Sequence, residues 1–462
     1  MSEDDTRNIS KTAFLSKVYE SFIGDWIFPY IDPFIDPGQC GGLKGSSITH
    51  YLVKLLHFVH SYLDTSQPHA VLLVLVDLEK AFNRVSHQLV IEDLADMHVP
   101  GWLLLILVSY LTERSMFMKY NGASSSRKML PGSSPQGAFL GILLFIIIFN
   151  GALLRPGIPR PYSLNLKYID DLSMLAAFNL KHLRDDPVHR PSPLNFNERT
   201  RHVLPQMNNY LQDELSCLEE FTTRKMLKIK EKKTFVLKFN FSRSLDFPPE
   251  LLINGFNDQV QVIQETKLLG IIITDDLKWA ANTDYICKRA YKNMWKLRRM
   301  KTLDVDPLVM LDVYMKEIRS VVELAVPAWH SGLTLAQTAD IERVQKVALS
   351  IILGTFRTGR KRVPYEWTLS TLDVEPLKKR RDMLCKTFAK KTLKTRHKEM
   401  FKDQHHHNTR NKDNFYEHYS KNGRFYNSLL NFLRGASKIK INGKIWEIFP
   451  TFAQLVGVEV VS

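Results

Sequence analysis

The chain has 462 residues, enough for two to four domains, and its 44% hydrophobic content with 11% aromatic residues predicts well-packed globular cores. Lysine and arginine exceed aspartate and glutamate by 63 − 48 = 15. This excess favours a polyanionic partner such as nucleic acid, although a generically basic surface would give the same charge. The most apolar stretch, residues 138–149, is too short for a membrane span, so no membrane partner is expected.

Cysteine usage and the N-terminus indicate the compartment. None of the four cysteines lies near another at metal-ligand spacing. We therefore expect reduced thiols and an intracellular protein, in the nucleus or the cytoplasm. The polar N-terminus predicts no secretory signal. The run His405–His407 could bind metal, but a solvated surface tract is favoured because no other ligands lie nearby in the sequence.

Taken in chain order, the first elements are helical. Apolar residues from Ile9 to Phe58 recur at helical spacing around an irregular Pro/Gly segment, which predicts two helices, the second beginning after Gly45-Ser46-Ser47. The apolar run from Val71 to Val76 predicts a strand buried on both faces. That strand would place Asp77 at its carboxyl end. A helical stretch is expected from His87 to Thr112.

A hairpin and a buried helix follow. Residues 116–120 and 127–130 flank Asn121-Gly122, a typical hairpin turn. Residues 138–154 are too apolar for an exposed helix, so this helix should pack beneath the sheet. A loop is expected at residues 155–161.

Asp170 and Asp171 are the central chemical feature. Short strands at 164–168 and 172–175 would make this pair the tip of a hairpin. An Asp-Asp pair is by itself an ordinary solvated turn, and the chain has others, such as Asp275-Asp276. Together with Asp77, however, the pair supplies three carboxylates at strand ends, as a two-metal phosphoryl-transfer site requires.

The remaining chain shifts from mixed to helical. We expect a loop at 181–200, a helix at 206–226 and a strand at 235–241. After Asp275 the pattern becomes helical and basic, and residues 377–394 are strongly basic. The sequence shows no internal repeat. The first basic stretch contains Lys288, Arg289, Lys292, Lys296, Arg298 and Arg299.

Five motifs in this order resemble the palm of reverse transcriptases, specifically those of non-LTR retrotransposons of the jockey-like or LINE type. The motifs are LVDLEKAFNRVSH at 75–87, GSSPQGAFLGILLF at 132–145, LKYIDDLSML at 166–175, LKIKEKKT at 227–234 and TKLLGIIITDDLKW at 266–279. Upstream, residues 9–20 and 39–50 are similar to the fingers of that family. The resemblance covers roughly residues 7–390.

The resemblance implies an α+β fold with right-hand polymerase architecture: an antiparallel-sheet palm, partial fingers and a helical thumb. The expected domains are partial fingers at 1–70, palm at 71–275, thumb at 276–390 and a basic C-terminal extension at 391–462. The fingers are expected to be truncated at the N-terminus, with no endonuclease or ribonuclease H domain. In the thumb, Trp279, Tyr291 and Trp295 are expected to be mostly core residues, and the basic side chains to track nucleic acid.

The implied activity is RNA-directed DNA polymerisation, with an RNA template, a DNA primer and dNTPs as partners. Asp77, Asp170, Asp171 and the carbonyl of Leu78 would hold two Mg²⁺ ions, for which Mn²⁺ is a possible substitute. Lys233 matches a lysine that could protonate the leaving group, although one lysine in a solvated run is an equally good explanation.

Nucleotide contacts are also carried by the resemblance. Phe82 would lie against the sugar and leave no room for a 2′-hydroxyl, which selects dNTPs, although an isolated Phe would by default be a core residue. Gly137 permits close backbone approach. The full implied set is Arg7, Phe82, Gln136, Gly137 and Tyr168.

Four positions depart from the family pattern, and none of them is a metal ligand: Asn83, Ala138, Ile142 and Lys230. The rival hypothesis is a catalytically degenerate fragment of a retrotransposon that binds nucleic acid without polymerising. An RNA-dependent RNA polymerase is disfavoured by Phe82. The oligomeric state, the natural template and the priming route do not follow from the sequence.

Overall fold

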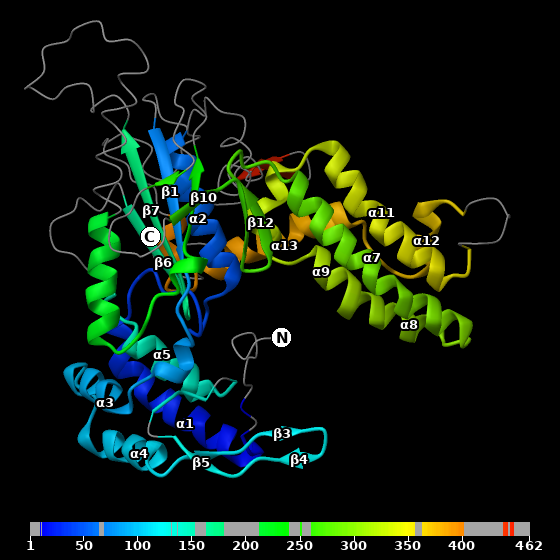
Figure 1. The fold of residues 1–462 in the computed structure, drawn as a ribbon. Coiled ribbons are helices and arrows are strands. Elements are labelled where there is room, and N and C mark those ends of the chain that lie inside the picture. Colours follow the sequence, from blue (N-terminus) through cyan, green and yellow to red (C-terminus); the bar gives the residue numbers. More distant parts are fainter. Residues whose placement is uncertain are drawn as a thin grey trace, which may run out of the picture. The chain divides into compact units, whose positions relative to one another are not determined.

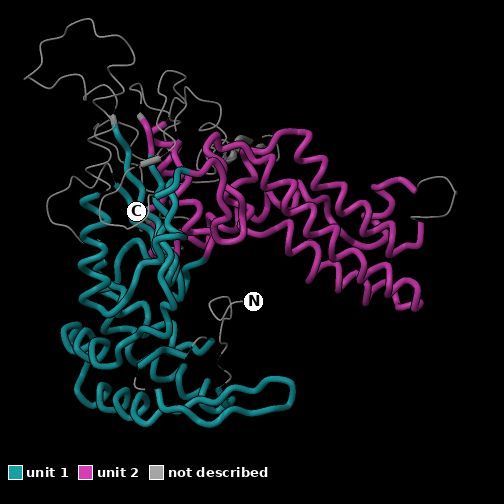
Figure 2. Tube along the Cα trace, viewed as in Figure 1, with its two compact units in different colours: residues 1–47, 72–236, 243–262 teal, residues 48–71, 237–242, 263–462 magenta. Residues whose placement is uncertain are grey.

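The computed structural model describes residues 10, 12–63, 69–130, 132–135, 137–152, 163–179, 212–239, 250–251, 260–355, 363–401, 438–441 and 444–447. Its chain divides into two compact units (Figure 2). Unit 1 comprises residues 1–47, 72–236 and 243–262, and unit 2 comprises residues 48–71, 237–242 and 263–462. The expected loops at 155–161 and 181–200 and the run His405–His407 lie outside the described residues.

Unit 1 begins with α1 (Phe14–Ile31), which packs against the later helix α5 (Phe139–Ile148). The expected first helix is confirmed, but it continues through Pro29 in its last turn. Its buried face contains Ile23 and Ile27, whereas Phe22 and Trp26 are 55% and 47% exposed. Further helical elements of unit 1 are η2 (Asp32–Phe34), η3 (Ala81–Arg84), α3 (His87–Asp96) and α4 (Gly101–Leu111).

The expected single helical stretch from His87 to Thr112 is wrong: the chain forms α3 and α4 with a break between them. Pro100 is the N-cap of α4, and a residue before proline is disfavoured in helical conformation. His98 also adopts a left-handed φ of 60°. The helical spacing of apolar residues continues through the break, so the periodicity of the sequence does not reveal it.

The principal sheet has six strands in the order β6-β7-β1-β8-β10-β9. Figure 1 shows β1 beside β7. The bounds are β1 (His69–Val76), β6 (Ser163–Tyr168), β7 (Asp171–Asn179), β8 (Phe235–Phe239), β9 (Glu250–Leu251) and β10 (Val260–Ile263). The strand expected from the apolar run before Asp77 is confirmed, and its described side chains from 70 to 74 are buried. The α+β class is confirmed by this sheet and its helices.

The apolar helix α5 is buried as expected, with Leu144, Phe145 and Ile148 inaccessible to solvent. Its expected end at residue 154 is wrong, because the helix ends at Ile148 and residues 149–152 form a turn. There the Asn150 side chain accepts a hydrogen bond from the Asp36 main chain, at 2.9 Å. Asn150 and Gly151, the latter with φ 73°, thus end the helix together with this tertiary contact.

The small hairpin is confirmed. Its inner strands β3 (Lys119–Tyr120) and β4 (Ala123–Ser124) pair across Asn121-Gly122, both of which have positive φ. Its outer strands β2 (Ser115–Met116) and β5 (Lys128–Met129) also pair. The expected helix at 206–226 is seen over the described residues 212–224, followed by η6 (Glu231–Lys233).

Unit 2 contains α2 (Ile48–Leu63), a hairpin and a helical assembly in which α7 packs along α11. Tyr314 and Gln345 form its polar core, since the Tyr314 hydroxyl donates to Gln345 Oε1 at 2.6 Å. Further bounds are β11 (Glu265–Leu268), β12 (Ile271–Thr274), α7 (Ala280–Thr302), α8 (Pro307–Val313), the π-helix η7 (Tyr314–Arg319), α9 (Ser320–Val322), α10 (Val326–Trp329), η8 (His330–Gly332), α11 (Leu335–Ile352), α12 (Tyr365–Thr371), α13 (Leu377–Thr392), η9 (Lys398–Phe401), β13 (Lys438–Ile441) and β14 (Lys444–Glu447).

The burial of the aromatic side chains in α7, and of Trp279 just before it, differs from expectation. Trp279 is buried, but Tyr291 is 37% and Trp295 58% exposed, so two of the three expected core aromatics face solvent. The reason is helical phase: the buried face of α7 contains Ala290, Met294 and Leu297 instead. Among the described residues, no helix is both long and apolar enough to span a membrane.

Candidate active site

The end of β1 is fixed by main-chain bonds to the segment before β8. The Lys230 N–H donates to the Asp77 carbonyl oxygen, and the Glu79 N–H donates to the Lys228 carbonyl oxygen, both at 2.8 Å. Leu78, between these two bonds, forms an antiparallel bridge to the segment. In a pair flanked by such bonds, the central residue directs its own N–H and carbonyl away from its partner. The Leu78 carbonyl therefore points away from this segment.

The second carboxylate element is the β6–β7 hairpin. Tyr168 pairs with Asp171, so the two-residue turn is Ile169-Asp170. The expectation that Asp170-Asp171 forms the tip is thus off by one residue, because Asp171 is already the first residue of β7. Ile169 takes the left-handed conformation that opens such a turn, with φ 62°. For a β-branched residue this conformation is strained.

The three carboxylates therefore come from two neighbouring strands. Asp77 directly follows β1, Asp171 begins β7, and β1 and β7 are adjacent in the sheet. Asp77 and Asp170 are half-buried, and Asp171 is exposed. Burial raises the pKa of Tyr168, and the nearby Asp171 raises it further, so the phenol stays neutral at neutral pH.

Phe82 lies in η3, five residues beyond Asp77. Its ring is 9% exposed and stacks on Phe145 of α5, with centroids 5.1 Å apart and planes at 26°. The carbonyl of Phe82 accepts from the Ser134 N–H at 2.7 Å. The ring thus packs on α5 while the Phe82 main chain bonds the loop before α5, and Phe82 is largely a core residue.

The other expected nucleotide-contact residues are only partly covered. Gln136 and Arg7 lie outside the described residues. Gly137 is exposed and has φ 107°, a conformation that favours glycine. Lys233 is exposed at the end of η6, on the segment whose Lys230 bonds the Asp77 carbonyl. Nucleotide contact by these residues remains a prediction.

The donor chemistry of the three aspartates fits Mg²⁺, which prefers carboxylate and carbonyl oxygens. Among the described residues, however, no three His, Cys, Asp or Glu side chains are gathered closely enough to hold a metal ion. The backbone places the aspartates on adjacent strands, while the side chains are not drawn together. Metal binding at this site is accordingly a prediction.

Sequence reasoning gave no role to Lys167 or Asp36. Lys167, one residue before Tyr168, is 3% exposed, and its Nζ pairs with Asp36 and donates to the Phe149 carbonyl at 2.8 Å. Burial lowers the pKa of Lys167, and the adjacent Asp36 opposes this shift. A lysine in an alternating strand pattern is expected to face solvent. The one signal in the sequence for a structural role of Lys167 was its position beside the Tyr168 motif.

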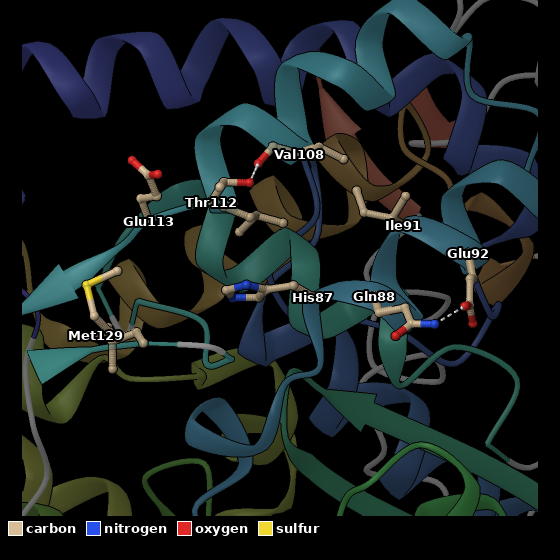
Figure 3. A pocket seen from close by; sticks show the side chains of 10 residues that line it. His87, Gln88, Ile91, Glu92, Val108, Thr112, Glu113 and Met129 are labelled. Carbon is tan, nitrogen blue, oxygen red and sulfur yellow. Dashed lines mark hydrogen bonds between the residues drawn. The ribbon is translucent and has the colours of Figure 1, made fainter.

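A cavity of about 630 Å³ lies elsewhere in unit 1, between α3, α4 and β5 (Figure 3). Ile91, Val108 and Leu111 supply its apolar walls, and His87 lies at its edge. The His87 ring bonds the Ser133 carbonyl at 2.8 Å, in the loop that precedes α5. None of the residues predicted from sequence lines this cavity.

The family model for reverse transcriptase (RNA-dependent DNA polymerase) matches residues 2–273 of the chain. The match covers more than half of the chain and includes the β1 end, the loop before α5 and the β6–β7 hairpin. The chain belongs to the reverse transcriptase family. No curated protein matches the chain in sequence.

Among solved structures, telomerase from Candida tropicalis in complex with a TWJ fragment of telomeric RNA is similar over 82% of this chain and 54% of its own, at 10% identity and a TM-score of 0.39. Telomerase from Candida albicans in complex with the same kind of fragment is similar over 82% of this chain and 55% of its own, at 10% identity and a TM-score of 0.28. The chain spans about half the length of these solved chains.

Proposed function

We propose that this protein is an RNA-directed DNA polymerase of non-LTR retrotransposon origin that adds dNTPs to a primer 3′-hydroxyl. The observation that carries the proposal is the position of Asp77 directly after β1 and of Asp171 at the start of the adjacent β7, in a chain of the reverse transcriptase family. The order and wording of the five motifs support the non-LTR origin.

Asp77, Asp170, Asp171 and the Leu78 carbonyl would hold two Mg²⁺ ions. The bound ions would lower the pKa of the primer hydroxyl and neutralise the triphosphate. Lys233 would donate a proton to the leaving pyrophosphate. Phe82, held on Phe145, would limit space at the sugar, and the Gly137 backbone would approach the nucleotide closely.

The exposed face of α7 supports binding to template and primer. Lys288, Lys292 and Arg299 recur at helical spacing on this face and are exposed. Trp295 lies among them, 58% exposed. Exposed cations interleaved with an aromatic ring are the pattern expected for a nucleic-acid backbone with stackable bases.

The deciding experiment is primer extension on an RNA template with dNTPs and Mg²⁺. We expect extension by the wild type and its loss in Asp170→Asn. Asp275→Asn is the matched control, because Asp275 is a half-buried member of another Asp-Asp pair after a strand, and it should leave extension unchanged. Salt-sensitive RNA binding without extension by the wild type would instead establish the non-polymerising alternative.

A further inference from the structure

A four-residue segment, Gly38–Gly41, extends the outer edge of β6. Gln39 and Lys167 form a parallel bridge. The Lys167 N–H donates to the Gly38 carbonyl at 3.0 Å, and the Cys40 N–H donates to the Lys167 carbonyl at 2.8 Å. Lys167 is two residues before the turn, so the segment fixes the strand immediately before the carboxylates.

The Gln39 side chain continues from this segment to the turn itself. It is 2% exposed, and its Oε1 accepts two main-chain N–H groups, from Gly41 at 2.9 Å and from Ile169 at 3.2 Å. Ile169 is the residue in the strained left-handed conformation. Such conformations persist only where surrounding contacts over-determine them. The Gln39 bond is one such contact, made to the strained residue directly.

Gly41 permits this approach. A Cβ at Gly41 would lie 2.5 Å from Ile169 N and 2.8 Å from Tyr168 C, both of them backbone atoms of the turn. A Cβ at Gly38 would likewise lie 2.0 Å from the Asn165 carbonyl oxygen. Backbone cannot move aside as a flexible side chain can. The segment and the hairpin therefore pack main chain against main chain.

The same segment is anchored at its other end. The Asp36 carboxylate pairs with Lys167 and accepts the Gly151 N–H at 3.0 Å, beyond the end of α5. The Asn150 side chain accepts the Asp36 N–H at 2.9 Å and donates to the Phe34 carbonyl at 2.8 Å. Segment 36–41, the end of α5 and β6 are thus joined by polar bonds, of which those of Lys167 are buried.

We propose that Gln39 is a positioning residue that holds the Ile169-Asp170 turn, and through it the carboxylates of Asp170 and Asp171, in the geometry the reaction requires. The catalytic part of this proposal rests on the proposed function, whereas its structural part stands on the hydrogen bond and packing alone. Residues that orient metal ligands typically change metal affinity or activity 10- to 100-fold when removed.

The first test needs no activity. Deuterium uptake of peptides that cover residues 163–175 is measured in wild type, Gln39→Leu and Gln39→Glu. Leucine removes the acceptor and should speed exchange in the turn, while glutamate keeps an acceptor oxygen and should preserve protection. Gln345→Leu is the matched control, since Gln345 is equally buried and also bonds a main-chain group, but in unit 2. Unchanged turn exchange in Gln39→Leu would overturn the proposal.

The second test is the Mg²⁺ dependence of primer extension. Gln39→Leu should raise the half-saturating Mg²⁺ concentration about 10-fold, and Gln345→Leu should not. If Gln39→Leu does not fold, Gly41→Ala is used, because it pushes the same turn while keeping the Gln39 side chain. Equal Mg²⁺ dependence in an active wild type and the folded variant would overturn the catalytic part. A wild type that does not extend, with faster turn exchange in Gln39→Leu, would instead refute the proposed function and support Gln39 as the residue that holds the turn.

Discussion

Two buried histidines should make unit 2 sensitive to acid. His50 on α2 and His397 lie with ring centroids 4.6 Å apart. The Thr392 hydroxyl donates to the Phe388 carbonyl at 2.8 Å, so it accepts from His50 Nε2, at 3.0 Å. Burial, together with the charge of Lys54, lowers the pKa of His50 to about 4. Burial, together with Lys54, His50 and Arg396, lowers the pKa of His397 to about 3. Protonating either ring places a cation in this cluster.

The magnitude follows from proton linkage. The ordinary pKa of 6.5 applies in the unfolded chain, which therefore binds more protons than the fold below that pH. The free energy of unfolding must then fall as pH falls through 6.5. From pH 7.5 to pH 5 the loss is about 2 kcal/mol for each histidine. Screening by the solvent around the cluster reduces this to about 1 kcal/mol each, or about 2 kcal/mol for the pair.

The assay is urea denaturation at pH 7.5 and pH 5, followed by far-ultraviolet circular dichroism. His50→Gln, which keeps a donor for Thr392, should remove about half of the wild-type loss at pH 5. His98→Gln is the control, because His98 is exposed in unit 1 and should leave the loss unchanged. If His50→Gln loses as much stability as the wild type, burial of His50 is not the origin of the acid sensitivity.

Three further predictions concern the buried ion pair, the sugar site and the nucleic-acid face. Lys167→Met should lower the free energy of unfolding by about 3–5 kcal/mol, measured by urea denaturation, because Asp36 would remain buried without its cation. Phe82→Leu, which keeps the contact surface of Phe145 largely filled, should raise rNTP incorporation relative to dNTP about 10-fold in steady-state extension, and an unchanged ratio would remove its assigned role. Lys292→Gln should reduce the slope of log affinity against log salt by about 0.9 in RNA–DNA duplex binding, with no slope change if this face does not contact phosphate.

The backbone of the candidate site was predictable because its signals are local. A six-residue apolar run followed by Asp77 specifies a buried strand with a carboxylate at its end. The Tyr168 motif between two short apolar runs similarly specifies a hairpin. Both elements formed where the sequence indicated, and they are neighbours in one sheet. Local patterns thus fixed which residues lie at the candidate site, although not the side-chain contacts among them.

The features that sequence reasoning missed depend on distant partners or on conformations without a composition signal. Gln39 and Ile169 are 130 residues apart in the sequence, and nothing in either residue type predicts the hydrogen bond between them. The break at His98 and the turn at Ile169 use left-handed φ at residues other than glycine. Trp295 is exposed because a different face of α7 is buried in the tertiary packing.

Left-handed non-glycine residues also occur beside each carboxylate or nucleotide motif of unit 1. Lys80 follows the Asp77 strand with φ 49°, Ser133 precedes the α5 loop with φ 92°, and Ile169 opens the Asp170 turn with φ 62°. Each of the three is held by a hydrogen bond. The Lys80 carbonyl accepts from the Asn83 N–H at 2.8 Å, and the Ser133 N–H donates to the Val85 carbonyl at 2.8 Å. The Ile169 N–H donates to the Gln39 side chain. Because strain at such positions persists only while these bonds hold, the geometry of the candidate site depends on contacts outside the motifs that identify it.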